Sequence, residues 1–538
     1  MVLCACALAS ACTKVGVQTA RNANSYSIPG TLRYADVDEP TSLNPLLRLD
    51  AVSTDLDMFI FGFFFNLDDK MHFVPELATE VPTLKNGGIS KDGLVITYHL
   101  RKGVRWHDGA PFTSRDVVFT TNAILNPSNN LQSRNGWDQI DHIQAVGDYE
   151  VKFYLKRPYA PAISSFFSEG GDYPVLPAHL LEKYPNINNV PFNADPIGTG
   201  PFKFVRWVHG DHIELVANQD YWRGPPKLQH IIFKIIPKDT TILVQLQTHE
   251  IDAWFRAPTA LWTEYQRLGP EYRVQLEQSL VFSHMDFNFK NPLFQDVRVR
   301  RAIDYAIDRD SIIKTVTHSV NIPVAAEVSP MSWAYDPNVP TYPYNPTQAK
   351  ALLAQAGWTP GPDGVLQKNG QRLAFDISAV TGGTTGEAVE SIVQQELRQL
   401  GIVANIKNYP ADRFFAPGQD GGIVQGGKYD VAFYAWVEGD DPDDYSLYGC
   451  SEFPPAGQNS MFWCDPTFDK ADDAGRRSYD QDQRKKDYAI AQYELASQVP
   501  TIVQWFQRQI YITSTNFHGF KPAPATSSNW NSWEWTMQ

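Results

Sequence analysis

Carboxylates flanked by aromatic rings lie together in one short segment of the chain, FYAWVEGDDPDDYSLYGC, residues 433–450. Its rings and acids are Phe433, Tyr434, Trp436, Tyr445 and Tyr448, and Glu438, Asp440, Asp441, Asp443 and Asp444. A carboxylate pairs with an amine, and aromatic rings bury apolar groups or lie against a cation. The segment therefore indicates a site for a ligand that carries apolar groups and a positive charge. A solvated acidic turn after a core strand, or a calcium loop, would use the same residue types.

Sequence motifs for catalysis, cofactors and metals are missing. There is no H-E-x-x-H, C-x-x-C or G-x-S-x-G, and no spacing pairs two carboxylates for acid–base work. His209 and His212 are three apart in a strand-like stretch, which points them to opposite faces. The stretch GIVQGGKY fits G-x-x-x-x-G-K, but Tyr429 stands where a P-loop needs Ser or Thr, and a predicted strand follows instead of a helix. We therefore expect no enzyme, no cofactor and no bound metal.

Length, charge and composition limit the class of protein. At 538 residues the chain is too long for one simple core, so two or three domains are expected. Hydrophobic residues make up 43% and charged residues 20%, as in an ordinary globular protein. The 60 acidic residues outnumber the 46 Lys and Arg residues, for a net charge of −14, which argues against nucleic acid as a partner.

Residues 1–29 have the features of an export signal followed by a tether. Cys4, Cys6 and Cys12 lie in a short apolar run of small residues, and polar, unpatterned residues follow. LASAC resembles the lipobox of bacterial lipoproteins, which predicts acylation of Cys12. Leu8 is one position too far from that cysteine and the run has no Lys or Arg, so a cleaved signal without a lipid is the alternative. No other apolar stretch approaches the roughly 18–20 residues of a membrane span, so we expect a soluble, exported body.

Cys450 and Cys464 are the cysteines outside this leader. Export brings a protein into an oxidising compartment, where a disulfide is permitted. We predict that these two residues are bonded, which would close a loop worth about 3 kcal/mol in the chain-entropy model. Two free thiols are the alternative, because a sequence does not show how close two Cα atoms lie.

Periodic segments predict an α/β organisation in the C-terminal half. Apolar residues over 299–307 fall at i, i+3, i+4, i+7 and i+8, which predicts a helix. A later helix has Asn345 as N-cap, Pro346 at its first position and Gly357 past its end. Between residues 374 and 436 the order is strand, helix, strand and strand, which is typical of an α/β domain.

The segment GTGPFKFVRWVHGDHIELVANQDYWRGPPKL, residues 198–228, strongly resembles the most characteristic segment of one family of ABC-transporter proteins. These are the peptide/nickel class of substrate-binding proteins, solute-binding family 5, which includes dipeptide- and oligopeptide-binding proteins. Other similar segments keep the family's order along the chain: SLNPLL, FVPELATEVPT, KDGLVITYHLRKGVRWHDGAPFTSRDVVFT, LVQLQTHEIDAW, NFKNPLFQDVRVRRAIDYAIDRDSII and YDPNVPTYPYNPTQAKALLAQAGW. The resemblance extends from about Gly30 to the C-terminus. In the first segment Gly, Pro and aromatic residues shape turns around a hairpin, so no catalytic group is needed there.

The resemblance implies an α/β fold like that of periplasmic binding proteins, a clam shell of two main lobes with a hinge and a smaller inserted domain. The expected limits are 30–65, 197–283 and 506–538 for a discontinuous domain I, 66–196 for domain II and 284–505 for domain III. Such a protein would capture a peptide or a related small solute by hinge closure and deliver it to a membrane permease with its ATPase. It would be a monomer on the periplasmic or extracellular face of the membrane, held there by a lipid.

The resemblance also implies where the ligand binds. Peptide-binding members have a W-x-x-D pattern after a strand such as YDVAFYAW, in which the Trp lines the pocket and the Asp binds the α-ammonium of the peptide. Trp436 matches this pattern, but Gly439 stands at the Asp position. Asp440 comes one place later and Glu438 one place earlier. We expect Asp440 to bind the cation, with Glu438 and Asp441 beside it.

Other assignments stay open. Asp443 is expected on an outer turn, away from the ligand. PTIVQWFQRQIY resembles the family's late strand, which makes Trp505 and Phe506 either further pocket residues or core residues. If Asp440 does not reach an amine, the resemblance allows a nickel chelate, haem, an oligosaccharide or an opine-like solute instead of a peptide. A secreted hydrolase that uses the acidic segment, and a receptor scaffold that presents a ligand to a sensor, are the alternative functions.

Overall fold

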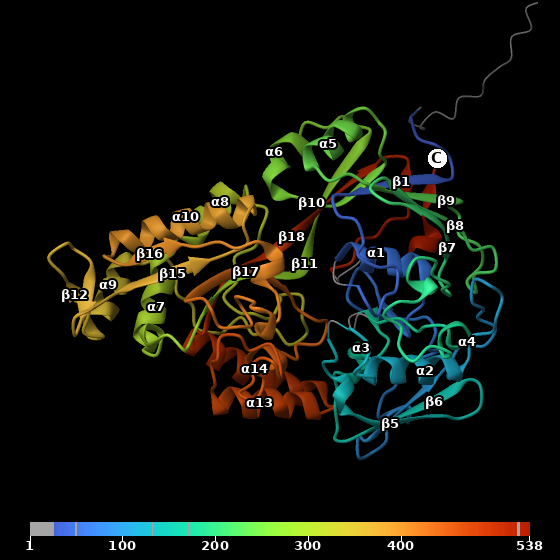
Figure 1. Cartoon of the computed structure of the whole chain (residues 1–538), viewed down its shortest axis with the longest axis horizontal. Coiled ribbons are helices and arrows are strands. Elements are labelled where there is room, and N and C mark those ends of the chain that lie inside the picture. The colour runs from blue at the N-terminus through green and yellow to red at the C-terminus, as the bar shows by residue number, and fades with distance from the viewer. Residues whose placement is uncertain (1–25, 49–50, 132, 170–172, 525–527) are drawn as a thin grey trace, which may run out of the picture.

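Two long antiparallel strands, β11 (Tyr272–Phe287) and β18 (Thr501–Ser514), connect the two lobes of the molecule (Figure 1). The computed structural model describes residues 26–48, 51–131, 133–169, 173–524 and 528–538. The predicted signal and the predicted lipidation site at Cys12 lie outside the described residues.

A sheet of ten strands runs through both lobes in the order β16-β15-β17-β11-β18-β10-β1-β9-β8-β7. The bounds of its other strands are β16 Val403–Ile406, β15 Ala374–Ser378, β17 Val431–Val437, β10 Ala253–Ala257, β1 Thr31–Asp36, β9 His230–Ile235, β8 His212–Ala217 and β7 Phe202–Val208. β1 pairs in parallel with both β9 and β10, while β11 pairs antiparallel with both β17 and β18. This mixed sheet, with helices packed on it in two lobes, confirms the expected α/β clam shell (Figure 1).

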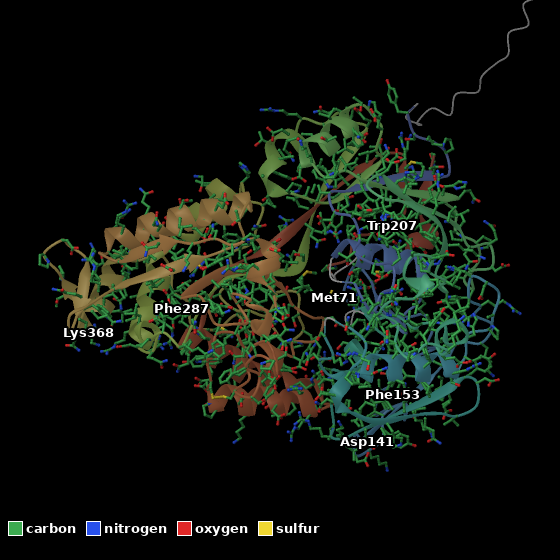
Figure 2. All side chains as sticks on the ribbon, in the orientation of Figure 1. Met71, Asp141, Phe153, Trp207, Phe287 and Lys368 are labelled. Carbon is green, nitrogen blue, oxygen red and sulfur yellow. A yellow bond between two sulfur atoms is a disulfide. The ribbon has the colours of Figure 1, made fainter. Side chains whose placement is uncertain are left out.

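The lobe that contains β1 also carries a smaller sheet in the order β4-β6-β5. Its strands are β4 Val95–His99, β6 Glu150–Leu155 and β5 Ile140–Ala145. The same lobe contains the short strands β2 Phe65–Leu67, β3 Phe73–Pro75, β19 Phe517–His518 and β20 Thr536–Met537. Its helices are α1 Ala51–Ile60, α2 Ser114–Leu125, α3 Ala162–Ser165, α4 Ala178–Leu181, α5 Asp239–Gln247 and α6 Trp262–Tyr265. Alternate residues of β6 are buried, and one of them, Phe153, shares a continuous apolar core with Tyr34 of β1 (Figure 2).

The segment at residues 198–228 forms the expected hairpin, in which β7 and β8 run antiparallel. Its first glycines lie against the end of α1, where the Gly200 N–H donates to the carbonyl oxygen of Ile60 at 2.8 Å. A Cβ atom on Gly198 would lie 1.8 Å from that same oxygen. Only glycine permits such a close approach of two backbones. The glycines that made this segment conspicuous in the sequence therefore have a packing role.

The other lobe contains the predicted strand–helix–strand unit, in which α10 (Thr384–Gln399) connects the parallel strands β15 and β16. Its other elements are α7 Val297–Ala306, α8 Arg309–Val316, α9 Pro346–Gln355, α11 Ala411–Phe414, α12 Tyr445–Tyr448, α13 Pro466–Arg477, α14 Gln481–Gln498, β12 Thr359–Pro360, β13 Leu366–Lys368 and β14 Gln371–Arg372. The Asn345 side chain accepts from the Gln348 N–H at 3.0 Å, so the predicted N-cap of α9 is confirmed. Phe287, at the end of β11, is fully buried in the core of this lobe (Figure 2).

The predicted domain limits after residues 283 and 505 fall inside the two connecting strands. Ser283 of β11 pairs with Trp505 of β18, and the register shifts directly after this pair. A second shift lies between Gln278 and Phe282. Irregular pairing bends a strand and increases its local twist. The shifts therefore mark where the two strands bend, and the limits themselves stay a prediction.

Cys450 and Cys464 are joined by a disulfide between α12 and α13, with their Cα atoms 4.6 Å apart (Figure 2). Replacing both cysteines by Ser is expected to lower the free energy of unfolding by about 3 kcal/mol, because the unfolded chain loses a closed loop. Denaturant titration of both proteins measures this difference. Thiol titration of the denatured, unreduced protein is expected to find no free thiol from this pair, and two reactive thiols would contradict the bond.

Candidate functional site

The acidic segment lies where the two lobes touch. The Tyr159 hydroxyl, from the loop between β6 and α3, donates to Asp443 Oδ2 at 3.1 Å. The Ala160 N–H donates to the carbonyl oxygen of Arg476, at the end of α13, at 2.7 Å. The Tyr479 hydroxyl, between α13 and α14, donates to the carbonyl oxygens of Gly93 and Tyr159 at 3.2 and 3.1 Å. The structure is therefore closed along this edge, where α13 lies beside α3 (Figure 1).

Trp436 stands near the end of β17, opposite Phe282 of β11 in the sheet register. Its side chain is partly exposed and packs against two apolar clusters, one that contains Tyr448 and one that contains Phe506. An aromatic ring that is anchored on two sides and open on a third is suited to form one wall of a ligand site.

Asp440 is half-buried in the loop after β17 and forms no ion pair within the described residues. Burial raises the pKa of its carboxyl to about 8, and the neighbouring Asp441 carboxylate adds to this. Three groups lower the pKa again without cancelling the rise: the N–H of Asp440 itself, the N–H of Asp441 and the Arg484 guanidinium. A ligand cation therefore stabilises the ionised form of this buried carboxyl group more than it would stabilise a solvated carboxylate.

The carboxylates of Asp441 and Asp443 each form an ion pair with an arginine. Arg484 Nη2 lies 2.6 and 2.7 Å from the two carboxylate oxygens of Asp441. Arg476 Nε lies 3.2 Å from Asp443 Oδ1, and both side chains are at least nine-tenths buried. The expectation that Asp443 lies on an outer turn is wrong. The Asp443 side chain is buried and contacts both Arg476 and Tyr159, which belongs to the other lobe. Asp441 likewise holds α14 through Arg484, which leaves it poorly placed to bind a ligand.

Glu438 points into the protein next to two other acids. Its Oε2 accepts from the Ser329 N–H at 2.7 Å, while its Oε1 has no hydrogen-bond partner among the described residues. Burial and the Asp444 carboxylate raise the pKa of Glu438 well above its ordinary value. Burial and the same Asp444 also raise the pKa of Glu327. Sequence reasoning missed Glu327, although a single acid within the apolar run PVAAEV was a usable signal.

Trp505 and Phe506 are core residues in the structure. Trp505 is 1% exposed, and its ring lies 6.2 Å from that of Phe433 inside the lobe. Phe506 is 2% exposed and lies 5.5 Å from Phe282. Ile502 and Trp505 belong to one apolar cluster and Val503 and Phe506 to another, so packing explains both side chains. We do not carry them into the proposed site.

The raised pKa values predict how the stability of the free protein depends on pH. The folded protein holds the proton of Asp440 up to about pH 8 and that of Asp444 up to about pH 7, far above their ordinary values. Glu390 and Glu396, each with a pKa raised to about 7 by burial, act in the same direction. Between these values and pH 4 the folded state binds more protons than the unfolded state, so stability falls as pH rises.

We therefore expect the melting temperature of the free protein to fall between about pH 6.5 and 8.5. His107, whose pKa burial lowers to about 4, acts in the opposite direction only below this range. Scanning calorimetry of the wild type and of Asp440→Asn checks the expectation, and the variant should have the shallower slope. A melting temperature that rises with pH in this range would contradict it.

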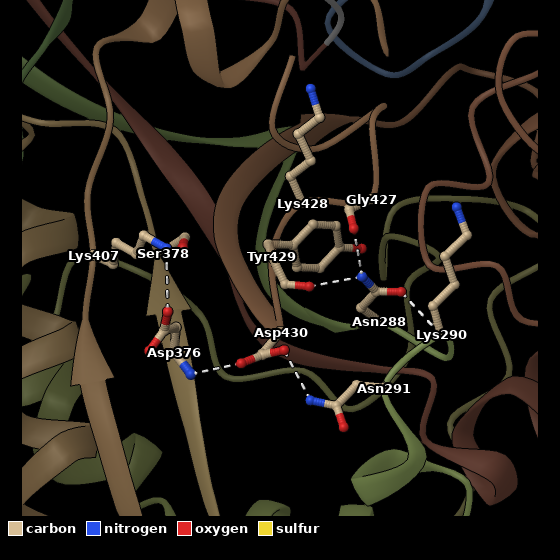
Figure 3. A pocket seen from close by; sticks show the side chains of 10 residues that line it. All are labelled: Asn288, Lys290, Asn291, Asp376, Ser378, Lys407, Gly427, Lys428, Tyr429 and Asp430. Carbon is tan, nitrogen blue, oxygen red and sulfur yellow. Dashed lines mark hydrogen bonds and ion pairs between the residues drawn. The ribbon is translucent and has the colours of Figure 1, made fainter. Parts of the chain in front are cut away.

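A pocket of about 390 Å³ lies at the opposite end of β17, away from the predicted residues (Figure 3). It is lined by Asn288, Lys290, Asn291, Asp376, Ser378, Lys407, Gly427, Lys428, Tyr429 and Asp430. Its acids have partners of their own, since Asp430 accepts from the Asn291 side chain at 2.8 Å and from the Asp376 N–H at 2.9 Å. The P-loop-like stretch ends here and leads into β17, a strand, as predicted.

The histidines that were three apart have separate partners. His209 lies 3.0 Å from Glu39, while His212 contacts Asp211 and Glu214. Within the described ranges, no three His, Cys, Asp or Glu side chains are placed to share a metal ion. A search of the same ranges for membrane spans finds no helix with the necessary length and apolar character.

The sequence is similar to known binding proteins over most of its length. The model of the family described as "Bacterial extracellular solute-binding proteins, family 5 Middle" matches residues 72–455. The oligopeptide-binding protein AppA of Bacillus subtilis is 30% identical over 507 residues, which cover 92% of this chain and 89% of AppA. The di/tripeptide-binding protein 2 of Pseudomonas aeruginosa is 29% identical over 482 residues, with 85% and 87% covered.

Solved structures agree with this similarity. AppA of Bacillus subtilis in complex with a nonapeptide superimposes with a TM-score of 0.80 at 27% identity, covering 95% of this chain and all of AppA. NikZ of Campylobacter jejuni in complex with Ni(L-His) superimposes with a TM-score of 0.81 at 28% identity, with the same coverage. One fold therefore accommodates ligands of very different size and chemistry.

Proposed function

The chain belongs to the family 5 bacterial extracellular solute-binding proteins, and we propose that it captures peptides between its two lobes. It then presents them to a membrane permease that is driven by an ATPase. The family consists of extracytoplasmic binding proteins, and we propose that this chain likewise catalyses no reaction. We also propose that it acts as a monomer, that a lipid on Cys12 anchors it, and that its domains have the limits predicted from the sequence.

One observation carries the proposal of a peptide ligand. Asp440 is a half-buried carboxylate without an ion pair in the described chain. It lies in the loop that follows Trp436 and β17, at the contact between the lobes. A peptide supplies what this site lacks, an α-ammonium for the carboxylate and an apolar side chain for the ring. Gly439 stands at the Asp position of the pattern and Asp440 follows it, and a glycine gives the backbone the freedom to bring this acid to the same place.

Closure follows from the arrangement of the connecting strands. β11 and β18 join the lobes side by side, and their register shifts lie near the middle of the sheet. A ligand that contacts both lobes binds the closed form better than the open one and so shifts the population toward it. The lobe contacts around Tyr159 add to this, because they exist only while the lobes are together.

Removing one lobe contact is expected to favour the open form. In Tyr159→Phe the hydroxyl that donates to Asp443 is lost, and a hydrogen bond to a charged group is worth about 1.5–3 kcal/mol. The free variant should have a larger radius of gyration by small-angle X-ray scattering, and its peptide affinity should fall about tenfold. Tyr154→Phe, which removes an exposed hydroxyl bonded to Gln144 in the same lobe, is the matched control. An unchanged radius and affinity would show that the contact does not govern closure.

Calorimetric titration with peptides of two to nine residues tests the proposed function. We expect saturable binding of peptides with a free N-terminus. N-acetylation should weaken binding about thirtyfold or more, because it removes the cation that faces Asp440. The proposal fails if none of the peptides binds, or if acetylated and free peptides bind equally well.

A further inference from the structure

More carboxylates than cations are buried behind Asp440. Glu327 and Glu438 are each 3% exposed and Asp444 is 9% exposed. Their electrostatic neighbours are other acids: Asp444 acts on both glutamates, and Asp441 and Asp443 act on Asp444. The two arginines of the region are already engaged by Asp441 and Asp443. The acids Glu327, Glu438 and Asp444, which we call the inner acid group, therefore have no cation of their own in the described chain.

Such an arrangement costs free energy unless something compensates it. A buried carboxylate without a cation or full hydrogen bonding is strongly destabilising, and native proteins avoid it. Protonation can remove this cost, and burial raises the pKa of all three groups in the direction that favours it. A cation that enters with a ligand can also remove this cost.

An independent observation indicates a ligand. The Tyr448 hydroxyl is buried, since the residue is 1% exposed, and it has no hydrogen-bond partner among the described residues. It lies in the field of Asp444, Glu327 and Glu438. Oε1 of Glu438 is also buried and unpartnered. Buried polar groups are nearly always hydrogen-bonded, so a phenol and a carboxylate oxygen left open together point to a missing donor.

The buried acids and the apolar surface beside them suit an organic cation. No three ligating side chains in the described ranges are placed for a metal ion. Tyr448 and Leu447 belong to the apolar cluster against which Trp436 packs, so an alkyl stem has apolar surface to follow. An ammonium or guanidinium group brings three or more N–H donors, which suits several carboxylate oxygens at once.

We propose that the bound peptide carries a second positive charge, a Lys or Arg side chain, which the inner acid group holds while Asp440 holds the α-ammonium. The inference rests on the proposed function and deepens it, because it assigns a preference for basic peptides. Glu438 is two residues before Asp440, so the two charged groups of the ligand belong to neighbouring parts of the same peptide.

Calorimetric titration with two matched sets of tripeptides tests this preference. One set has a single Lys among Ala residues at the first, second or third position, and the other has norleucine, which has a similar stem without the charge. At one position we expect Lys to bind about thirtyfold or more tightly than norleucine. Glu438→Gln and Glu327→Gln should each reduce this ratio to about threefold or less and leave the norleucine affinities within about threefold of the wild type.

The outcomes separate the two proposals. Equal affinities for Lys and norleucine at every position would overturn the second cationic site and leave peptide binding intact. If no tripeptide of either set binds, both proposals fail together. Two substitutions are used because one of them could disturb folding, and melting curves of the free variants reveal whether it does. If both variants fold and the ratio of Lys to norleucine affinity stays high in both, the assignment to the inner acid group is overturned.

Discussion

Replacing Asp440 by Asn is expected to abolish most of the affinity for a peptide with a free N-terminus. The substitution keeps the shape of the side chain and removes its charge, so the ligand ammonium would be desolvated without a counter-ion. Truncating one partner of a buried charge pair costs on the order of 2–5 kcal/mol, which corresponds to roughly a thirtyfold to several-thousandfold loss. Asp440 is suited to this role because it has no competing ion pair in the described chain.

Two companion variants make this result specific. Asp482→Asn, at an exposed position in the first turn of α14, should leave affinity unchanged. Trp436→Ala should weaken binding through lost contact area, for acetylated and free peptides alike. Calorimetric titration at about pH 7.5 measures all three variants. Equal affinities of the wild type and Asp440→Asn would remove the amine site, and with it most of the case for a peptide.

Replacing Arg484 by Met is expected to cause the largest loss of stability near the site. The guanidinium group contacts both carboxylate oxygens of Asp441, the carbonyl oxygen of Gly475 at 2.9 Å and the Tyr488 hydroxyl at 3.1 Å. The side chains of Arg484 and Asp441 are only 10% and 12% exposed. Removing one partner of a buried pair leaves the other uncompensated, which costs about 3–5 kcal/mol in the free energy of unfolding.

Chemical denaturation of the free protein measures this loss, and two controls identify its cause. Arg477→Met breaks a pair with Asp473 whose side chains are 46% and 28% exposed, so it should cost less than about 1 kcal/mol. Adding Asp441→Asn to Arg484→Met removes the orphaned charge and should restore part of the stability. A loss in Arg484→Met no larger than in Arg477→Met would show that the buried pair is not what holds α14 against the acidic loop.

Local rules predicted the elements that depend on neighbouring residues. The N-cap of α9 at Asn345 and the hairpin of β7 and β8 follow from capping and turn preferences that act within a few residues. The α/β order of the second lobe follows from alternating periodicities. The joined Cys450 and Cys464 are also close in sequence, so a short loop brings them together.

The site was harder to predict because its charges come from distant parts of the chain. Asp443 looked like a surface acid, since its partners Tyr159 and Arg476 lie in other segments and one of them is in the other lobe. Glu327 approaches Asp444 only through the tertiary fold. A W-x-x-D pattern locates the loop, but it does not show which of its acids already has an arginine. That distinction depends on α13 and α14, which follow the loop in the sequence.

The central claim is that a peptide is the natural ligand, and mass spectrometry of the molecules that the native protein carries tests it most directly. The protein is purified without denaturation from cells that grow on a peptide-containing medium, and its bound small molecules are released by denaturation and identified. We predict short peptides with free N-termini, in amounts comparable to the protein, which Asp440→Asn purified in parallel does not retain. A comparable amount of haem, an oligosaccharide or a nickel chelate in place of peptides would contradict the account.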